Sequence, residues 1–524
     1  MKKNLMSLAV AASVATAATT AQAAMYLDPE GTGQVLLFPY YNAVGTNETY
    51  IHIVNTTADA KAVKVRMLEY INSQEVLDFN LYLSPNDHFA FTIFQHPDGD
   101  NAALVTMDNS CTVPALGSAT GLGGTLEGFV RADGAKVQPF LPYQYQSEYS
   151  GLDFDARSQV GHVEVIEMGT LTNEDADSTT AFNPAAYATH DSAGVPANCA
   201  ALVGAWSSVS ATTGTWTSSA STQIGAATGG LYGISNVLDS ADAAAFGIEA
   251  AAIDSFWAAG ASNHTDPGNL KPSLGEGEKS AIITAGADAY TLVYSGTEGG
   301  WDAVSALFMS DTVSNDVMLN PVVNGATDWV VTFPTKKAYV NRTTAKAPFS
   351  DIYATGTSTK PLTYTGTNLS CETIKLKQWN REESTAVVGI DGPAFSPEPP
   401  AAVTPGNTLC LETNTLAMGA AGTASVTNTV LAGTGTEYLP ASNLSFKTGE
   451  VEGWMRMSFE ATTQVLDADS STKAGTNGAS VTANTRLEGL PVMGFAAFKY
   501  VNGDRTFGFV SDHKTSTSGS AIHS

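Results

Sequence analysis

The stretch "YIHIVNTTADAKAVKVRMLEY", residues 50–70, decides the fold class of this chain. In its second half Val63 and Val65 alternate with Lys64 and Arg66. Strict alternation gives a strand one apolar and one polar face, as in an antiparallel sheet that covers a core with one side. The first half alternates in the same way, and the polar "NTTADAK" separates the two runs. The stretch therefore predicts two neighbouring half-buried strands.

The same pattern extends on both sides of this stretch, over residues 33–94. The candidate strands are "GQVLLFPYY", "TYIHIVNT", "AVKVRMLEY", "EVLDFNLYL" and "HFAFTIF". Short alternating runs separated by polar turns at this spacing predict an antiparallel β-sandwich. The expected fold class is mainly β, with an immunoglobulin-like β-sandwich architecture, a small helical insert and one sandwich or more.

Two segments of the later chain are expected to be helical. "SADAAAFGIEAAAIDSFW", residues 240–257, has an N-terminal Ser or Asp cap followed by Ala-rich turns, and "GWDAVSALFMSD", residues 300–311, is a shorter candidate. The predicted organisation then has four parts. These are a signal peptide (1–23), an N-terminal β-sandwich (24–170), a Ser/Thr/Gly-rich loop and helical insert (171–275), and a C-terminal β-rich region (276–524) whose strands can pair with N-terminal ones.

The N-terminus predicts export. "MKKNLMSLAVAASVATAATTAQA" has Lys2 and Lys3, an uncharged small-apolar run and a final Ala-Gln-Ala. These are the three regions of a secretory signal peptide. The expected location is the cell surface or the extracellular space, with the periplasm as the alternative. No later stretch reaches the ~20 apolar residues that a membrane-spanning helix needs.

The charge balance excludes one class of partner. Lys plus Arg number 25 and Asp plus Glu number 51, a net charge of −26 at pH 7. Such a chain repels the phosphate backbone, so nucleic-acid binding is not expected. The hydrophobic content of 43% is sufficient for packed cores, which argues against wholesale disorder.

Four cysteines allow three disulfide pairings. Export permits disulfides, and Cys111–Cys199 with Cys371–Cys410 is favoured because each pair is the closest in sequence. The second disulfide would join two segments across the Pro-rich "DGPAFSPEPPAAVTPGN". No C-x-x-C motif occurs, which argues against a zinc ribbon or a dithiol redox site.

Catalytic signatures are missing from the sequence. It contains no G-x-S-x-G, H-E-x-x-H, Walker A or G-x-G-x-x-G motif, and we expect a protein that is not an enzyme. The most concentrated polar segment is "DFDARSQVGHVEVIEMG". His162 and Glu164 would share one strand face, and Asp153 and Asp155 another, as general acid–base or metal-binding pairs require. The favoured alternative is a solvent-facing polar row.

The loop "HPDGDN" carries the candidate calcium ligands Asp98, Asp100 and Asn101 around Gly99. Oxygen ligands near a turn glycine suit Ca²⁺, the one cofactor that we consider, although the Glu of an EF-hand loop is missing. The alternative is a solvated acidic turn.

Two further segments are candidate contact surfaces. Tyr143 and Tyr145 in "QPFLPYQYQSEY" can stack on a sugar or anchor a protein interface, unless they pack at strand ends. Lys336, Lys337, Arg342 and Lys346 in "TKKAYVNRTTAK" form a basic cluster that can dock an acidic patch of a neighbouring copy, unless it is a solvated strand face.

Several of these segments also carry a resemblance. "AMYLDPEGTGQVLLFPYYN", "IVNTTADAKAVKVRMLEYINSQEVLDFNLYLSPND" and "VEVIEMG" resemble a group of uncharacterised exported or cell-surface proteins of Gram-negative bacteria, and "DWVVTFPTKKAY" and "GFAAFKYVNG" are further similar blocks. The layout of the first third is similar to the immunoglobulin-like parts of many bacterial exported proteins. The resemblance implies a location, and it carries over no catalytic residue.

The expected function is that of a secreted, non-enzymatic structural or adhesion protein at the cell surface. Its partners would be copies of itself or other cell-surface components. The N-terminal arm of the mature chain, residues 24–32, would complete a neighbour's sheet by strand addition. The alternative is a secreted carbohydrate- or polymer-binding module, and a hydrolase that uses two carboxylates is the least favoured class.

Overall fold

The computed structural model of the chain describes fourteen segments. They are residues 24–145, 155–174, 182–208, 213–286, 288–341, 343–353, 369–381, 385–387, 408–420, 429–431, 441–446, 451–473, 480–481 and 485–520. The predicted signal peptide and Asp153 lie outside them. The protein is mainly β, with 47% strand and 11% helix, which confirms the predicted fold class at that level. The immunoglobulin-like arrangement of strands stays a prediction.

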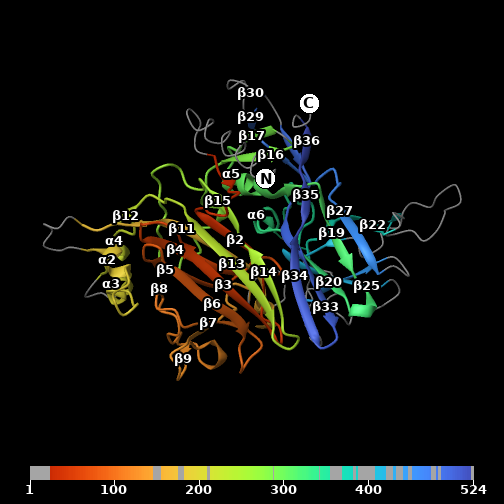
Figure 1. The fold of residues 1–524 in the computed structure, drawn as a ribbon. Coiled ribbons are helices and arrows are strands. Elements are labelled where there is room, and N and C mark those ends of the chain that lie inside the picture. The colour runs from red at the N-terminus through yellow and green to blue at the C-terminus, as the bar shows by residue number, and fades with distance from the viewer. Residues whose placement is uncertain are drawn as a thin grey trace, which may run out of the picture.

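The N-terminal half forms two stacked antiparallel sheets (Figure 1). The first contains, in spatial order, β1 (Tyr26–Leu27), β15 (Ala251–Asp254), β2 (Val35–Asn42), β11 (Val160–Leu171), β4 (Lys61–Glu69), β5 (Glu75–Leu83) and β8 (Cys111–Val113), with β12 (Ile224–Gly225) on β11. The second contains β14 (Ala244–Glu249), β13 (Leu231–Asp239), β3 (Asn47–Asn55), β6 (His88–Gln95), β7 (Ala102–Thr106), β10 (Lys136–Pro139) and β9 (Phe129–Val130). All five strands predicted within residues 33–94 are confirmed.

The alternation in β4 places its apolar residues in the core between these sheets. Val63 and Val65 are fully buried and pack with Phe79 of β5, and with Ile51 and Phe91 of the facing sheet. Burial of each such side chain stabilises the fold by about 1.5–3 kcal/mol. The apolar residues that alternate along the second half of the stretch 50–70 therefore lie at the centre of the N-terminal sandwich.

The helix predicted over residues 240–257 is wrong, because this segment forms β14 and β15. Ala244, Phe246 and Ile248 point inward while the residues between them are exposed, which is the period of a strand. Alanine favours helices locally, but pairing with β13 and burial of Phe246 override that preference. Residues 231–254 thus belong to the N-terminal sheets rather than to a helical insert.

The helices of the described chain are short. They are α2 (Pro184–Ala188), α3 (Cys199–Ala205), α4 (Thr215–Ser218), α5 (Gly299–Phe308) and α6 (Lys336–Tyr339), with the 3₁₀ turns η1 (Gly124–Leu126), η2 (Asp155–Gln159), η3 (Leu274–Glu276) and η4 (Pro321–Val323). The second predicted helix is confirmed as α5. The group α2–α4 lies within the predicted insert and packs on the outer side of the first sheet around Trp216 and Tyr82.

A small sheet and α5 cover another part of that outer side. The sheet contains β16 (Ser280–Ala285), β17 (Asp288–Val293), β29 (Ser470–Lys473) and β30 (Ser480–Val481). Met25 is fully buried there, and its backbone bonds both Ser280 and Ile282. The N-terminal arm is thus held within its own chain, as part of this core.

The C-terminal part contains a second pair of sheets, each with five strands (Figure 1). One has the order β26 (Ala441–Phe446), β25 (Thr413–Ala420), β20 (Ala326–Thr332), β33 (Met493–Asn502) and β34 (Arg505–Asp512). The other has the order β23 (Thr385–Val387), β22 (Lys375–Asn380), β27 (Glu452–Ser458), β19 (Thr312–Met318) and β35 (Lys514–Ser516). The remaining short strands are β18 (Met309–Ser310), β32 (Leu490–Pro491), β21 (Glu372–Thr373), β24 (Thr408–Leu409), β28 (Val465–Asp467), β31 (Arg486–Glu488) and β36 (Ser518–Ser520).

The two halves meet through side-chain packing. Tyr40 and Phe246 of the N-terminal sheets pack with Val330 and Phe495 of the C-terminal sheet, and the rings of Tyr40 and Phe495 are 6.1 Å apart. Among the described residues, the one β-bridge between residues 24–170 and 276–524 is at Met25, and the amides of Glu412 and Thr413 also donate to the carbonyl oxygen of Tyr70, each at 3.0 Å.

Candidate ligand-binding face

The polar face of β4 is buried and forms an ionic layer. Arg66 donates to Glu75 at 2.7 Å and to Glu164 at 2.5 Å. On the opposite parity of β4, that of Val63, Lys61 donates to Glu167 at 2.7 Å, and both side chains are fully buried. Charges are tolerated inside a protein only when they are paired in this way.

The favoured interpretation of His162 and Glu164 as a solvent-facing row is therefore wrong. Both lie in the buried layer, each with 1% of its surface exposed. Burial, and then Arg66 and Lys337, lower the pKa of His162 to about 3, and burial raises the pKa of Glu164. Asp155 is exposed at the start of η2 instead of joining them. The side chains of His162 and Glu164 are therefore not accessible to an external substrate in this structure.

His162 should make the fold sensitive to acid. It stays neutral when folded, whereas an unfolded histidine titrates near its ordinary pKa of 6.5, so stability is lost as the pH falls from about 6.5 toward 3. We expect wild type to lose about 2 kcal/mol more than His162→Leu between pH 7 and pH 5. Urea titrations of both proteins at the two pH values measure this difference. Equal losses would contradict a buried neutral His162.

The candidate calcium ligands differ in exposure. Asp98 and Asp100 are exposed, whereas Asn101 is buried, and its amide donates to the carbonyl oxygen of Phe140 at 3.3 Å. Within the described ranges, no group of three or more His, Cys, Asp or Glu side chains is placed to hold a metal ion. Calcium at this loop stays a prediction.

The two candidate aromatic residues lie in different environments. Tyr143 is 48% exposed, but Tyr145 is 1% exposed and its ring lies 4.6 Å below the guanidinium of Arg157. A ring enclosed in this way is not accessible to a sugar. A binding role at this segment can therefore concern Tyr143 alone.

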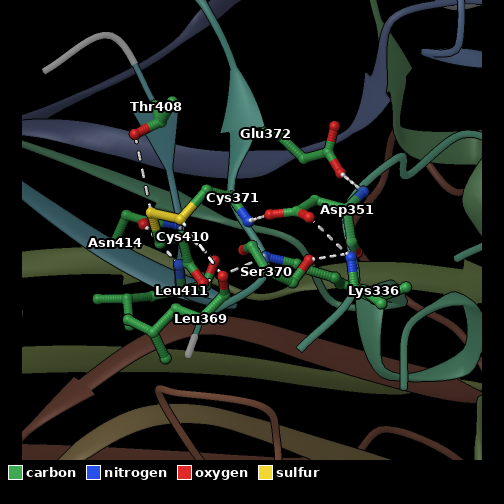
Figure 2. Close-up of a disulfide and its surroundings, with 11 residues drawn as sticks. Lys336, Asp351, Leu369, Ser370, Cys371, Glu372, Thr408, Cys410, Leu411 and Asn414 are labelled. Atoms are coloured by element: carbon green, nitrogen blue, oxygen red, sulfur yellow. Dashed lines mark hydrogen bonds between the residues drawn. A yellow bond between two sulfur atoms is a disulfide. The ribbon is translucent and has the colours of Figure 1, made fainter. Parts of the chain in front are cut away.

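The predicted basic cluster lies mostly inside the protein. Lys336 is fully buried and donates to the carbonyl oxygens of Ser370 at 2.8 Å and Cys410 at 3.3 Å (Figure 2). Lys337 donates to the carbonyl oxygen of Ser73 at 2.7 Å, and the exposed Lys346 forms an ion pair with Glu298. The interpretation of this segment as a basic docking surface is therefore wrong for Lys336 and Lys337, and Arg342 lies outside the described residues.

Both predicted disulfides are confirmed. Cys111 bonds Cys199 and Cys371 bonds Cys410. The second joins the residues next to β21 and β24, where the amide of Cys371 donates to Asp351 at 2.8 Å (Figure 2). Disulfides of this kind indicate an oxidising environment, extracellular or periplasmic. In the part of the chain that the structure describes, no helix has both the length and the apolar character needed to cross a membrane.

An exposed face with ligand-binding chemistry lies elsewhere, on the outer side of the sheet that contains β22, β27, β19 and β35 (right side of Figure 1). Trp379 of β22 is directly opposite Trp454 of β27. Their rings stack at 3.9 Å between centroids with an angle of 8°, and both are partly exposed. The opposite parity of these strands, which includes Leu376 and Met455, is buried in the second sandwich core.

A row of basic residues lies beside this tryptophan pair. The strand register places Lys377 opposite Arg456, Arg456 opposite Ser314, and Ser314 opposite Lys514. Lys377, Arg456 and Lys514 are exposed, and we call them the cationic row. The guanidinium of Arg456 lies 5.3 Å from the ring centre of Trp454 and 5.7 Å from that of Trp379.

Part of this face can be recognised in the sequence. "KLKQWN" places Lys375, Lys377 and Trp379 on one parity, which is the signal of an exposed basic and aromatic strand face. Its partner "GWMRMSFE" lies more than 70 residues further on, and the register between them is not readable from either segment. For this reason the pair was not predicted as a site.

No protein-family model, curated protein or solved structure matches this chain.

Proposed function

We propose that this chain is an exported, non-enzymatic adhesion protein that holds a saccharide polymer on the face around Trp379 and Trp454. The observation that supports this most is the stacked, partly exposed tryptophan pair on a regular sheet. The signal-peptide pattern and the two disulfides support export. The resemblance to exported and cell-surface proteins agrees with this location.

The geometry suits a polymer better than a small molecule. Two indoles on neighbouring strands present apolar surface on an exposed sheet, and such surface suits the C–H faces of sugar rings. Arg456 adds hydrogen-bond donors next to the rings. Partly exposed indoles on a regular sheet let a long chain lie across the strands, whereas small ligands are usually bound in concave sites.

Trp379→Ala should weaken binding to a saccharide polymer by about 5- to 150-fold, since about 1–3 kcal/mol is typical for a lost aromatic stacking contact. Affinity electrophoresis on a panel of surface polysaccharides measures the change. Tyr232→Ala is the matched control, because Tyr232 is 37% exposed on β13 of an N-terminal sheet. A wild-type protein that is not retarded by any polymer would contradict the proposal.

Self-association is the second candidate function. The structure gives no support to residues 24–32 as a free donor strand, because Met25 is already buried in its own chain. Exposed aromatic surface occurs instead on the β33–β34 hairpin, where Phe507 and Phe509 stack on Tyr500 and Phe498. A second copy can dock on this ladder, and light scattering of Phe507→Ser/Phe509→Ser beside wild type tests the idea.

A further inference from the structure

We infer that the polymer bound at this face is an acidic polysaccharide, one that carries carboxylate groups at regular intervals. This inference rests on the proposed function and specifies its ligand. It is carried by the cationic row, Lys377, Arg456 and Lys514, which runs across the sheet alongside the tryptophan pair.

The basic residues of this face differ in whether a carboxylate accompanies them. Lys375 pairs with Glu460 at 2.6 Å, and Arg381 pairs with Glu452 at 3.2 Å. For the cationic row, no carboxylate among the described residues lies within ion-pair distance. The row therefore has charge available for a ligand, whereas its neighbours are already neutralised.

The pairing of Lys377 with Arg456 is electrostatically unfavourable unless an anion is bound. Lys377 and Arg456 are directly opposite one another on neighbouring strands. Like charges in that position repel, and a sheet is more stable with an oppositely charged or neutral pair there. A carboxylate bound between the two side chains would turn this repulsion into two attractive contacts, and Arg456 can bind it with two parallel hydrogen bonds.

The dimensions of the row fit an extended chain. Strands in a sheet are about 4.8 Å apart, so Lys377 and Arg456 are one interval apart and Lys514 lies two intervals beyond, about 14 Å in all. The tryptophan pair is two residues further along the strands, about 7 Å away. A saccharide chain that crosses the strands can thus place ring faces on the indoles and carboxylates on the row. Asp316, opposite Trp454, directs anionic groups away from the far side of the pair.

The net charge of −26 does not prevent this binding. At physiological ionic strength the Debye length is about 8 Å, so charges elsewhere on the protein are largely screened at this face. The local cations and the indoles then decide the affinity. Nucleic acid offers the same negative charge, but the three residues of the cationic row are few beside the roughly 6–10 phosphate contacts typical of nucleic-acid binding.

The test uses two forms of one polymer, polygalacturonate and its fully methyl-esterified derivative, which share a backbone and differ in charge. Titration calorimetry at 0.15 M salt should show the wild-type chain binding the acidic form at least 10-fold more tightly. Lys377→Gln/Lys514→Gln should lose most of this preference and keep its binding to the ester, because neither lysine touches the tryptophan rings. Lys375→Gln, which alters a lysine already paired with Glu460, should retain the preference.

The outcomes separate the two levels of the proposal. Equal wild-type binding to both forms would overturn the acidic ligand and leave the saccharide-binding function in place. A wild-type protein that binds neither form, nor any polymer of the surface panel, would overturn both. Single-stranded DNA bound as tightly as polygalacturonate would overturn the assignment to a saccharide. Circular dichroism of each variant confirms that the sheet is intact.

Discussion

Replacing Lys61 by methionine is expected to lower the free energy of unfolding by about 3–5 kcal/mol. Lys61 donates to Glu167 at 2.7 Å and to the hydroxyl of Thr228 at 2.7 Å. Glu167 also accepts hydrogen bonds from the amides of Thr228 and Gly229, at 3.0 and 2.7 Å. Methionine fills a similar volume but leaves a carboxylate with no exposed surface and no cation beside it, and that uncompensated charge is the main cost.

A second variant distinguishes the lost pair from lost packing. Lys61→Met/Glu167→Leu removes both charges, so it should be more stable than the single variant, in spite of the two changes. Lys346→Met is the matched control because the Lys346–Glu298 pair is about half exposed, and a change within about 0.5 kcal/mol is expected. Urea unfolding at pH 7 gives all three values. A single variant no less stable than the control would mean that the Lys61–Glu167 pair is solvated in solution.

The buried ionic layer marks the limit of prediction from the first part of the sequence. Alternation in residues 61–69 correctly predicted a strand and its apolar face, because that information is local. It also suggested that Lys64 and Arg66 face water, which is the usual position of charged residues. The residues that cover them are distant in the chain, since Lys64 donates to the carbonyl oxygen of Pro267. The pattern of residues 61–69 alone does not show that distant residues cover Lys64.

The candidate ligand-binding face illustrates the same limit for a site. Strands β22 and β27 each show basic and aromatic residues on one parity, and this signal is local. The property that matters is that Trp379 meets Trp454 and that Lys377 meets Arg456, which depends on the register of two distant strands. Proximity in sequence was informative for the disulfides, by contrast, because the nearest-neighbour pairing of four cysteines is a choice among only three.

Removing a disulfide is expected to have an effect as large as that of breaking the buried pair. Loop-closure entropy predicts a cost of about 4 kcal/mol for Cys371→Ala/Cys410→Ala and about 5 kcal/mol for Cys111→Ala/Cys199→Ala, whose residues are 39 and 88 positions apart. Unfolding in urea under oxidising conditions measures both values.

The two disulfide variants should also differ in stability because of the contacts around Cys371 and Cys410. Cys410 presents its carbonyl oxygen to buried Lys336, and Cys371 presents its amide to Asp351, so the backbone at this disulfide also positions charged groups (Figure 2). Burial lowers the pKa of Lys336 to about 8, so loss of these carbonyl contacts would leave its ammonium poorly solvated. The cost of Cys371→Ala/Cys410→Ala should therefore exceed its entropic value of about 4 kcal/mol. A cost well below 4 kcal/mol would mean that the 371–410 loop stays closed without the disulfide, held by the hydrogen bonds around Lys336 alone.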